Sequence, residues 1–449
     1  MRVVVIGGDA AGMSAASQVK RLQGADITVT VLNEQSWTSY SACGIPYWIG
    51  GEADGPDALV ARTPEEHRTR GIDVRTGMRA TAIDPERHIV TAESVIDGAV
   101  EDFEYDHLVL ATGARPVAPP IPGLDLPGVF RVHTLDQAQA AIDALARRPS
   151  RAVILGAGYI GVEMAEACLN RDLHTTIVDR AAEPLVLLDP DMGALVRAAM
   201  VDRGVVVEMG ESVRRIVAGP DGRVAQVVTD SKQIDADIVF LGLGVRPRSE
   251  LAEAAGLPLG EWDGILVDER QQVLGHDTIW AGGDCIEVSD RLTGHRRFVP
   301  LGTHANKHGR VIGLNLGGEP ATFPGVIGTA ITKFCDVEIS RTGLLSTEAT
   351  AAVSVVIDTS TAVGYLPDAG PMTVKMIADP ATRRVLGVQI VGAPSAGLRI
   401  DSAATAIWNG MTVDDIIGLD LAYAPPYTPV WSPIQTAARA LLSQLAGPR

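Results

Sequence analysis

An apolar strand, a glycine-rich turn and a helix follow one another between residues 152 and 169. The strand is Ala152–Leu155, and the helix is expected over Val162–Leu169. Glycines in such a turn let the backbone approach a pyrophosphate, whose charge then meets the positive end of the helix. This order of elements predicts an α/β unit that binds a dinucleotide through the turn residues Gly156, Gly158, Tyr159, Ile160 and Gly161.

The next predicted strand, Thr175–Val178, ends in two charged residues that bear on the choice of nucleotide. Asp179 stands where an acidic side chain holds a ribose 2′-hydroxyl, which favours NADH. Arg180 is beside it and can instead pair with a 2′-phosphate, which would favour NADPH. The sequence favours NADH and leaves NADPH open.

A second strand–turn–helix pattern begins at the N-terminus. Strand Arg2–Ile6 leads into a turn that includes Gly7, Gly8, Ala11 and Gly12, and a helix is expected over Met13–Leu22. Asp9 occupies the usual middle glycine position, so the match is imperfect. At the end of the next strand either Asn33 or Glu34 can serve as the ribose ligand, with Glu34 favoured.

Two further segments accompany this N-terminal turn. The first is Ala111-Thr112-Gly113, which follows an apolar strand, and the second is Gly282-Gly283-Asp284 after Thr278–Ala281. Together with the two glycine turns they resemble a flavoprotein that binds two dinucleotides. The resemblance implies FAD in the first site and places Asp284 at the ribityl and phosphate region of the flavin.

Length indicates about three domains in 449 residues. Prolines concentrated between Pro116 and Pro127 indicate a linker, because proline lacks a backbone donor. From about residue 326 the pattern changes to strands such as Met372–Ile377 and a helix near Ile400–Trp408. We therefore expect a first domain over 1–115 and 246–325, a second over 116–245 and a third over 326–449.

Charge and cysteine content restrict the partners and the cellular compartment expected for the chain. A net charge of −17 argues against a nucleic-acid or anionic-membrane partner. The N-terminus enters a strand directly, and no apolar run reaches the roughly 18 residues of a transmembrane helix. Widely separated cysteines suit a reducing cytoplasm, and Cys168, Cys285 and Cys335 are expected in core packing, the last within a strand.

Cys43 is the exception among the cysteines. It lies in the segment Ser39–Gly51 and is followed by Gly44 and Pro46, a pattern that suits the start of a helix. There the helix dipole is expected to lower the pKa of the thiol, and a thiolate attacks disulfides. The segment predicts a reactive sulfur.

This segment resembles the single-cysteine branch of the pyridine nucleotide-disulfide oxidoreductases, which contains coenzyme A-disulfide reductases and NADH oxidases. A second matching element, Asp420–Trp431, lies near the C-terminus, so the resemblance spans the chain. Dithiol members have a second cysteine where this chain has Trp48. The implied fold is α/β, with two Rossmann-like domains for FAD and NAD(P) and a C-terminal α+β dimerisation domain.

The resemblance also implies roles for particular residues. Tyr365 and Tyr427 match tyrosines that protonate or orient a departing thiolate in a homodimer whose subunits complete each other's sites. Tyr159 matches a nicotinamide-gating aromatic residue, Glu163 a carboxylate beside the flavin, and Ser41 a cofactor contact. For coenzyme A, the expected contacts are Lys20, Arg21, Ser39, Arg62 and Arg70, whereas Ala42 and Gly71 depart from the reductase pattern.

The sequence thus predicts an enzyme in which NAD(P)H reduces FAD and FAD reduces Cys43, with coenzyme A disulfide as the favoured substrate. A related disulfide or polysulfide is a second possibility for the same chemistry. An NADH oxidase, with Cys43 cycling through sulfenic acid, is the alternative enzyme. Ala10 and Ala11 stand where peroxidases have a histidine, which disfavours peroxide reduction. A flavin-bearing electron-transfer or signalling scaffold is the alternative from another class.

Overall fold

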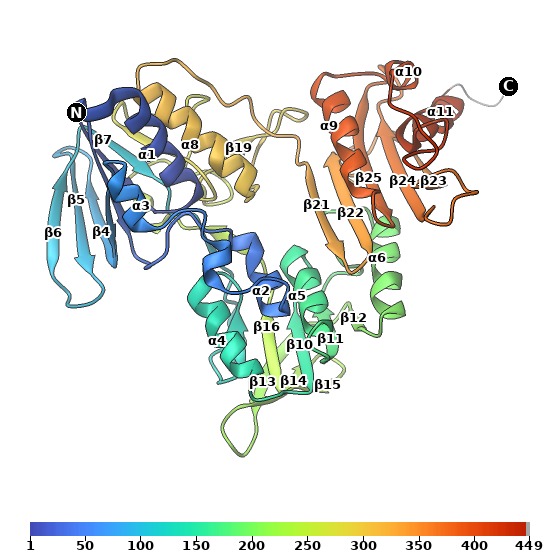
Figure 1. Ribbon diagram of the computed structural model, residues 1–449, viewed down its shortest axis with the longest axis horizontal. Coiled ribbons are helices and arrows are strands. Elements are labelled where there is room, and N and C mark those ends of the chain that lie inside the picture. The colour runs from blue at the N-terminus through green and yellow to red at the C-terminus, as the bar shows by residue number, and fades with distance from the viewer. Residues whose placement is uncertain (446–449) are drawn as a thin grey trace.

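The computed structural model describes residues 1–445 and builds three units around three five-stranded sheets (Figure 1). The first unit combines the N-terminal segments with residues around 280–316, the second occupies the middle of the chain, and the third is C-terminal. Among residues 1–445 no helix is long and apolar enough to cross a membrane.

The sheet of the first unit is parallel, in the order β18–β7–β1–β2–β3. Its strands are β1 (Arg2–Ile6), β2 (Thr28–Asn33), β3 (Asp73–Thr76), β7 (His107–Leu110) and β18 (Ile279–Ala281). β18 pairs with β7 in the register Ile279↔Leu108. The chain therefore returns to the first sheet after completing the second unit, as the sequence predicted.

Alternate residues of β1 point to opposite faces of this sheet. Val3 and Val5 pack in one core cluster with residues of α1 (Ala10–Gln23) and α8 (Gly302–Leu316). Val4 and Ile6 pack in another, on the side of an antiparallel sheet made of β4 (Met78–Asp84), β5 (Ile89–Ser94) and β6 (Val100–Glu104). Both faces of the sheet are thus covered, which leaves its strand ends for the site.

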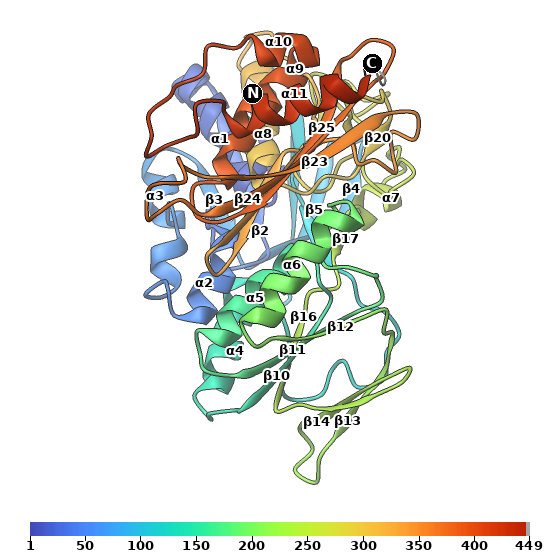
Figure 2. The same cartoon turned by 90° about the vertical axis from the view of Figure 1, so that its right-hand side faces the viewer.

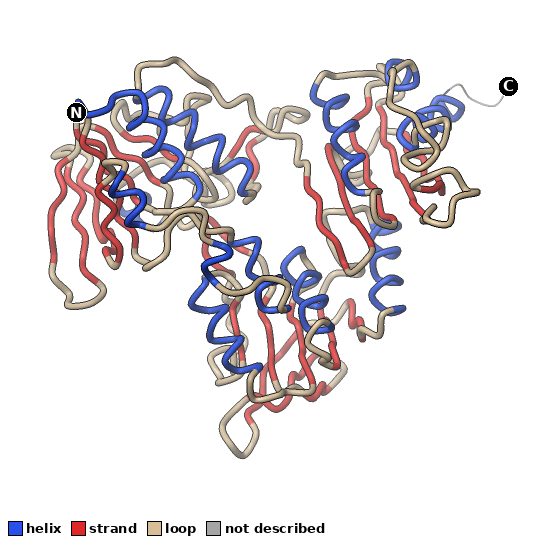
Figure 3. The backbone as a smooth tube through the Cα atoms, in the orientation of Figure 1, coloured by secondary structure: helices blue, strands red, loops and turns tan. Residues whose placement is uncertain are grey.

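The second unit repeats the parallel arrangement in the order β12–β11–β10–β16–β9. Its strands are β9 (Val129–Arg131), β10 (Arg151–Leu155), β11 (His174–Asp179), β12 (Val206–Met209) and β16 (Ile238–Leu241). Helices α4 (Leu135–Leu145), α5 (Tyr159–Leu169) and α6 (Pro190–Asp202) accompany them (Figure 3). A small sheet of β13 (Val213–Ala218), β14 (Val224–Thr229) and β15 (Gln233–Asp235) projects from the far end (Figure 2).

Two short strands join the first unit to the second. β8 (Ala114–Pro116) pairs antiparallel with β17 (Val245–Pro247), in the register Arg246↔Arg115. The outgoing and returning chains therefore run side by side at the junction. The domain limits expected at 115/116 and 245/246 fall inside this ladder.

Helix α2 (Ile45–Gly50) belongs to the first unit by sequence but packs into the second. Ile45, Trp48 and Ile49 are buried in the same core cluster as residues of α5. Arg171, which follows α5, donates its Nε to the carbonyl oxygen of Ile49 at 2.7 Å. The segment that carries Cys43 is thus attached to the second unit.

The third unit is an antiparallel sheet in the order β21–β22–β25–β24–β23. Its strands are β21 (Ala330–Phe334), β22 (Val337–Gly343), β23 (Val353–Ser360), β24 (Pro371–Ala378) and β25 (Val385–Gly392). Helices α9 (Ile400–Trp408), α10 (Val413–Ile417) and α11 (Pro433–Leu445) share its core. Cys335, expected within a strand, instead occupies the β21–β22 turn with φ +54°, a correction to the sequence prediction.

The remaining helices and strands of the described chain are short. They are α3 (Pro64–Thr69), α7 (Glu250–Ala254), β19 (Val288–Ser289) and β20 (Arg296–Arg297).

Candidate active site

The first glycine-rich turn joins β1 to α1 and has no room for larger side chains. Gly7 has φ +110°, and a Cβ atom there would lie 2.0 Å from the carbonyl oxygen of Ala111. A Cβ on Gly12 would lie 2.0 Å from the carbonyl oxygen of Gly7. Gly8 donates its N–H to Oδ1 of Asn33 at 3.1 Å. Backbone atoms therefore line the turn, which suits a bound pyrophosphate.

Asp9, the departure from the glycine pattern, connects this turn to the cysteine segment. Its Oδ1 accepts a hydrogen bond from the backbone N–H of Tyr40 at 3.1 Å. Burial raises the pKa of the Asp9 carboxyl to about 6. The aspartate thus holds the loop that leads to Cys43, a role that the sequence pattern did not reveal.

A cavity of about 620 Å³ opens beside the first turn. The predicted cofactor ligands that line it are Gly7, Gly8, Asn33, Glu34, Ala111, Thr112, Gly113 and Asp284. The Asn33 amide is engaged within its own loop, because Nδ2 donates to the carbonyl oxygens of Gln35 and Trp37 at 2.9 and 2.8 Å. Glu34 is the residue of this pair that carries charge on the cavity wall.

Sequence reasoning missed a group of arginines on the same wall. Glu34 forms ion pairs with Arg248 at 2.9 Å and with Arg79 at 3.7 Å, and Arg115 also lines the cavity. Guanidinium groups suit a diphosphate because their paired donors match its oxygens. The three arginines come from separate segments, so no local pattern in the sequence marked them.

A second cavity of about 840 Å³ adjoins the first and contains the cysteine. The predicted site residues that line it are Ala11, Arg21, Ser39, Ser41, Cys43, Arg62, Ala111, Gly113 and Asp284. Both cavities share Asp9, Ala111, Gly113 and Asp284 as wall residues. A long ligand whose diphosphate lies at the first glycine turn can therefore extend from that turn toward Cys43.

The flavin-side turn before Asp284 is held from beneath by a histidine. Gly283 has φ +84° and donates its N–H to Nδ1 of His308 on α8 at 3.2 Å. Burial raises the pKa of the Asp284 carboxyl to about 6. A buried carboxylate at the boundary of the two cavities suits a hydroxyl-bearing chain such as the ribityl of FAD. The glycine cradle, the arginines and Asp284 together fit this cofactor.

Cys43 lies in a 3₁₀ turn, Ala42–Gly44, immediately before α2. Its side chain is exposed to the second cavity. The pKa of the thiol is nevertheless raised, first by partial burial among cavity-wall atoms and then by the carboxylates of Glu163 and Asp284. The expected lowering of this pKa is therefore wrong in direction, because burial and the two carboxylates act against it.

The second glycine turn, between β10 and α5, has the geometry of a nucleotide site. Gly156 has φ +102°, and a Cβ there would lie 2.3 Å from the Gly242 carbonyl oxygen. A Cβ on Gly161 would lie 1.9 Å from the Gly156 oxygen. A Cβ on Gly158, by contrast, would have no heavy atom of the described chain within 4 Å apart from Gly158 and its two neighbours in the chain. The open side suits the close approach of a pyrophosphate.

Asp179 lies at the end of β11, next to this second turn. Its Oδ2 accepts from the N–H of Ala157 at 2.6 Å, and its Oδ1 accepts from the N–H of Ala181 at 2.8 Å. Arg180 is exposed beside it. The predicted ribose ligand is therefore fixed in place, and the predicted phosphate ligand faces solvent.

Tyr159 and Glu163 occupy successive turns of α5, the helix that packs against α2. Burial raises the pKa of Tyr159 to about 12 and also raises that of Glu163. Glu163 accepts a hydrogen bond at Oε1 from the hydroxyl of Thr332 at 2.9 Å. Ile160 lies between them and packs against the core of the second unit.

The basic residues expected to bind coenzyme A divide into two groups. Arg21 and Arg62 line the second cavity, together with Arg310 of α8, whose role the sequence did not indicate. Lys20 and Arg70 are absent from the described lining of that cavity. Lys20 instead donates its Nζ to the carbonyl oxygen of Ile27 at 2.9 Å.

His67 was not anticipated from the sequence either. It is fully buried in the second cavity wall, and its Nε2 lies 2.9 Å from the hydroxyl of Ser39. No local pattern marks this pair, because Ser39 lies in a loop and His67 lies on the helix Pro64–Thr69, 28 residues farther along the chain. The contact fixes the orientation of a predicted substrate ligand.

Tyr365 and Tyr427 lie on the third unit and outside both cavities in the described chain. They are 73% and 74% exposed. Arg399 donates to the carbonyl oxygens of Thr361 and Tyr427, which brings their two loops side by side. An exposed pair of tyrosines on one surface is the arrangement expected if each serves the site of a second subunit.

Comparison with known proteins places the whole chain. Residues 1–309 match the pyridine nucleotide-disulphide oxidoreductase family, and residues 329–433 match its dimerisation domain. The NAD(P)H coenzyme A polysulfide/persulfide reductase of Pyrococcus horikoshii is 38% identical over 447 residues, 98% of each chain. An NADH oxidase of Methanocaldococcus jannaschii is 35% identical over 99% of this chain and 100% of the relative.

Solved structures agree with this assignment. A NAD-dependent persulfide reductase from A. fulgidus has a TM-score of 0.96 and 39% identity, covering 100% of this chain and 84% of that one. The water-forming NADH oxidase of Lactobacillus brevis bound to NADH has a TM-score of 0.94 and 28% identity, covering 99% of both chains. With both of its family domains present, the chain belongs to the pyridine nucleotide-disulphide oxidoreductase family.

Proposed function

We propose that this FAD-dependent enzyme uses NAD(P)H to reduce a coenzyme A-linked sulfur substrate through Cys43. The substrate class comprises the disulfide, persulfide and polysulfide of coenzyme A, with the disulfide first. One observation carries the proposal: Cys43 lines the same cavity as Asp284 and as the three arginines Arg21, Arg62 and Arg310. A nucleotide that carries a thiol, such as coenzyme A, requires a reactive sulfur close to the flavin and cationic side chains for its phosphates.

Comparisons support the same substrate class. Relatives named as coenzyme A-dependent sulfur oxidoreductases from Pyrococcus furiosus and Pyrococcus abyssi are 38% and 39% identical to this chain. The reduced coenzyme A-disulfide reductase-type protein of Bacillus anthracis has a TM-score of 0.95 with 30% identity.

The first chemical role belongs to the Cys43 thiolate. It attacks one sulfur of the substrate, so that a sulfur–sulfur bond forms with Cys43 and the other half departs as a thiolate. FAD, which the first glycine turn and Asp284 would hold, would supply the two electrons, taken as hydride from NAD(P)H, that cleave the mixed disulfide. Cys43 thiolate and the second product thiolate result, and the electrons balance. Basic residues hold the nucleotide part throughout.

Positioning and proton delivery fall to other side chains. We assign Glu34, Asp284 and the first glycine turn to FAD, and Asp179, Arg180 and the second turn to the nicotinamide nucleotide. Ser39 and Ser41 line the path to the sulfur. Tyr427 and Tyr365 of one subunit protonate or steer the departing thiolate in the site of the other. Burial raises the pKa of the Glu163 carboxyl, which suits a group that exchanges a proton with the site of Cys43.

We further propose the division 1–115 with 246–325, 116–245 and 326–449 as the three domains, a homodimer with shared sites, and a cytoplasmic location. The dimerisation domain of the family and the exposed tyrosines support the dimer.

The test compares acceptors under anaerobic conditions. Oxidation of NADH and of NADPH is followed with coenzyme A disulfide, with polysulfide plus coenzyme A, and with glutathione disulfide as a control lacking the nucleotide. Cys43→Ser is run in parallel, with FAD content measured on each preparation. Turnover with coenzyme A acceptors that disappears in Cys43→Ser supports the proposal. Equal turnover with glutathione disulfide, or undiminished turnover in Cys43→Ser, refutes it.

An NADH oxidase is the second candidate, favoured by the full-length similarity to the M. jannaschii and L. brevis enzymes. Here Cys43 would cycle through sulfenic acid while oxygen is reduced. Oxygen uptake with NADH as sole donor decides: uptake faster than sulfur-acceptor turnover selects the oxidase.

A further inference from the structure

A buried polar row crosses the sheet of the third unit. Arg341 on β22 and Lys375 on β24 are both register partners of Gln389 on β25. Directly opposed residues in a sheet point to the same face. The three residues are 5%, 6% and 1% exposed, respectively. Two buried cations and an amide in one row need partners. Arg341 donates to the carbonyl oxygen of Gly343 in its own strand, whereas Lys375 and Gln389 find a carboxylate of the second unit.

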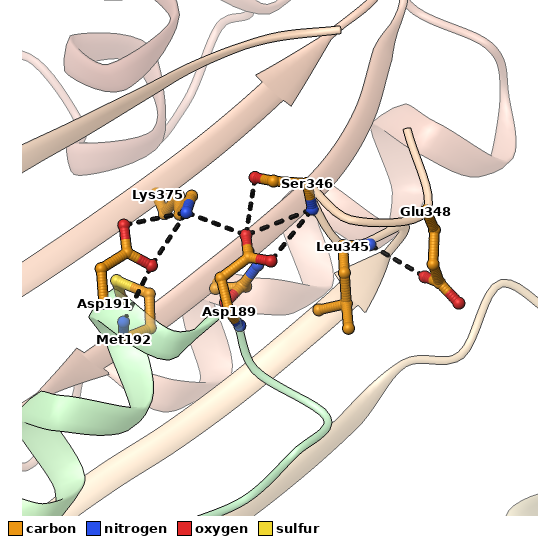
Figure 4. A network of polar contacts seen from close by, with 8 residues as sticks. Asp189, Asp191, Met192, Leu345, Ser346, Glu348 and Lys375 are labelled. Carbon is orange, nitrogen blue, oxygen red and sulfur yellow. Dashed lines mark hydrogen bonds and ion pairs between the residues drawn. The ribbon is translucent and has the colours of Figure 1, made fainter. Parts of the chain in front are cut away.

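Asp189, immediately before α6, is the main partner (Figure 4). Its Oδ2 lies 2.9 Å from Nζ of Lys375 and accepts from Nε2 of Gln389 at 2.8 Å. The hydroxyl and the N–H of Ser346 donate to the same carboxylate at 2.7 and 3.0 Å. Gln389 returns a bond, because its Oε1 accepts from the Asp189 N–H at 2.8 Å.

The capping position makes this arrangement unusual. An aspartate at a helix N-cap ordinarily accepts from the first amides of its own helix. Within residues 1–445 the Asp189 side chain makes no such bond and is directed to the third unit instead. Lys375 also donates to both oxygens of Asp191 at 2.8 Å, so the first turn of α6 is fixed to β24. Removing either partner leaves a buried charge uncompensated.

The contacts of Asp189 and Asp191 with Lys375 and Gln389 form a joint between the second and third units. The segment 180–188 connects this joint to the second glycine turn. At its start, Asp179 accepts from the N–H of Ala157. Farther along, buried Leu185 donates its N–H to the carbonyl oxygen of Ala157 at 2.8 Å. Ala157 is therefore held on both sides by a segment whose end, Asp189, is fixed to the third unit. A displacement of Asp189 is transmitted to the turn through Leu185.

The other end of the polar row approaches the predicted nicotinamide gate. Within the described chain, the buried Nε of Arg341 has no hydrogen-bond partner. Burial lowers the pKa of Arg341, and the opposing influences come from Tyr159, Glu348 and Asp189. The row thus extends from Asp189 toward Tyr159, along the boundary between the second and third units.

We propose that Asp189 and the row Arg341–Gln389–Lys375 are positioning residues for the nicotinamide nucleotide. They hold segment 180–188 and thereby the shape of the turn at Ala157. The inference goes beyond the choice of sulfur acceptor, but it rests on the assignment of NAD(P)H to the second turn. Loosening the joint weakens nucleotide binding without changing hydride transfer from the nucleotide once bound.

Stopped-flow reduction of the FAD-loaded enzyme by NADH, without any acceptor, separates these two quantities. The concentration dependence gives the Kd for NADH, and the plateau gives the limiting rate. Lys375→Met is expected to raise Kd by roughly two- to thirtyfold, the range of coupling exerted between sites, at an unchanged limiting rate. Hydrogen exchange of residues 180–188 is expected to accelerate in the same variant.

Two further variants make the test secure. Ser346→Ala removes one bond to Asp189 without burying a free charge, and we expect a smaller rise in Kd of the same kind. Arg383→Met, which breaks an exposed ion pair with Asp414 of 3.1 Å in the same unit, is the control and should leave Kd unchanged.

Asp179→Ala separates the two assumptions. An unchanged Kd in Asp179→Ala means that the nucleotide does not bind at this turn. A raised Kd in Asp179→Ala with wild-type Kd in both Lys375→Met and Ser346→Ala overturns the positioning role alone. A fall in limiting rate at constant Kd overturns it as well.

Discussion

The backbone N–H of Gly283 donates to Nδ1 of His308 at 3.2 Å. The accepting nitrogen carries no proton, so this contact requires a neutral imidazole. Burial accordingly lowers the pKa of His308 to about 3. The ring of Phe323 contacts the imidazole edge to face, with 4.3 Å between the ring centroids. The conformation of the turn that precedes Asp284 thus depends on the protonation state of one histidine.

A pH dependence of stability follows from this contact. The unfolded chain takes up a proton at His308 near pH 6.5, whereas the folded protein does so only near 3. The contribution of His308 to the free energy of unfolding is therefore complete above about pH 6.5. It declines by about 1.4 kcal/mol per pH unit as the pH falls toward 3. Urea unfolding should show about 2 kcal/mol less stability from His308 at about pH 5 than at about pH 7. His308→Gln should remove this difference, whereas His295→Gln, at an exposed position, should keep it.

Two glycine substitutions should separate the nucleotide sites. Gly12→Ala places a methyl group 2.0 Å from the Gly7 carbonyl oxygen, a backbone atom that cannot move aside as a flexible side chain could. We expect about 2 to 3 kcal/mol of destabilisation and loss of FAD from the purified protein. Gly158→Ala meets free space, so FAD content and unfolding should stay at wild-type values while the Kd for NADH rises about tenfold. Normal FAD content in Gly12→Ala would contradict the first assignment.

The nicotinamide preference should divide between two neighbouring residues. Asp179→Ala removes the carboxylate bound by the Ala157 and Ala181 amides, and we expect weaker NADH binding. Arg180→Ala removes an exposed cation. The Kd for NADPH should therefore rise about tenfold, whereas the Kd for NADH should not change. Flavin reduction with each nucleotide measures both effects. Equal losses for the two nucleotides in Arg180→Ala would exclude a 2′-phosphate contact.

Shared sites in the dimer can be tested by complementation. Cys43→Ser lacks the nucleophile and Tyr427→Phe lacks the proposed proton donor, so each homodimer should lose most sulfur turnover, the second by about tenfold. If Tyr427 serves the partner's site, a mixed dimer contains one intact site and regains activity. No regain on mixing, with dimer exchange verified by mass, would place Tyr427 outside the partner's site. Tyr365→Phe should behave in the same way with a smaller effect.

The fold and the nucleotide turns were predictable because their signals are local. The Gly156–Gly161 turn lies between a strand and a helix in the sequence and in the structure alike, and the return of Ile279–Ala281 to the first sheet was predicted by a similar strand and turn. Helix α9 begins and ends at the expected residues, Ile400 and Trp408. In each case a few consecutive residues contain the whole signal.

The features that were missed depend on residues distant in sequence. Arg79 and Arg248 meet Glu34 only because three segments converge at one sheet edge. The pKa of Cys43 was predicted in the wrong direction because its burial, and then the carboxylate of Glu163 from the second unit, both arise only from tertiary packing. The partner of Lys375 likewise requires the packing of α6 on the third sheet. Local patterns contain none of this information.

Helix α2 has a mechanical consequence for the catalytic cycle. Trp48 and Ile49 are buried in the core of the nucleotide-binding unit, only a few residues after Cys43. Swinging that unit outward would extract these side chains into water, at a cost of about 1.5 to 3 kcal/mol for an aliphatic residue alone. The unit proposed to bind the electron donor and the reacting sulfur are therefore coupled through α2, which favours motions of loops and side chains over hinge opening during turnover.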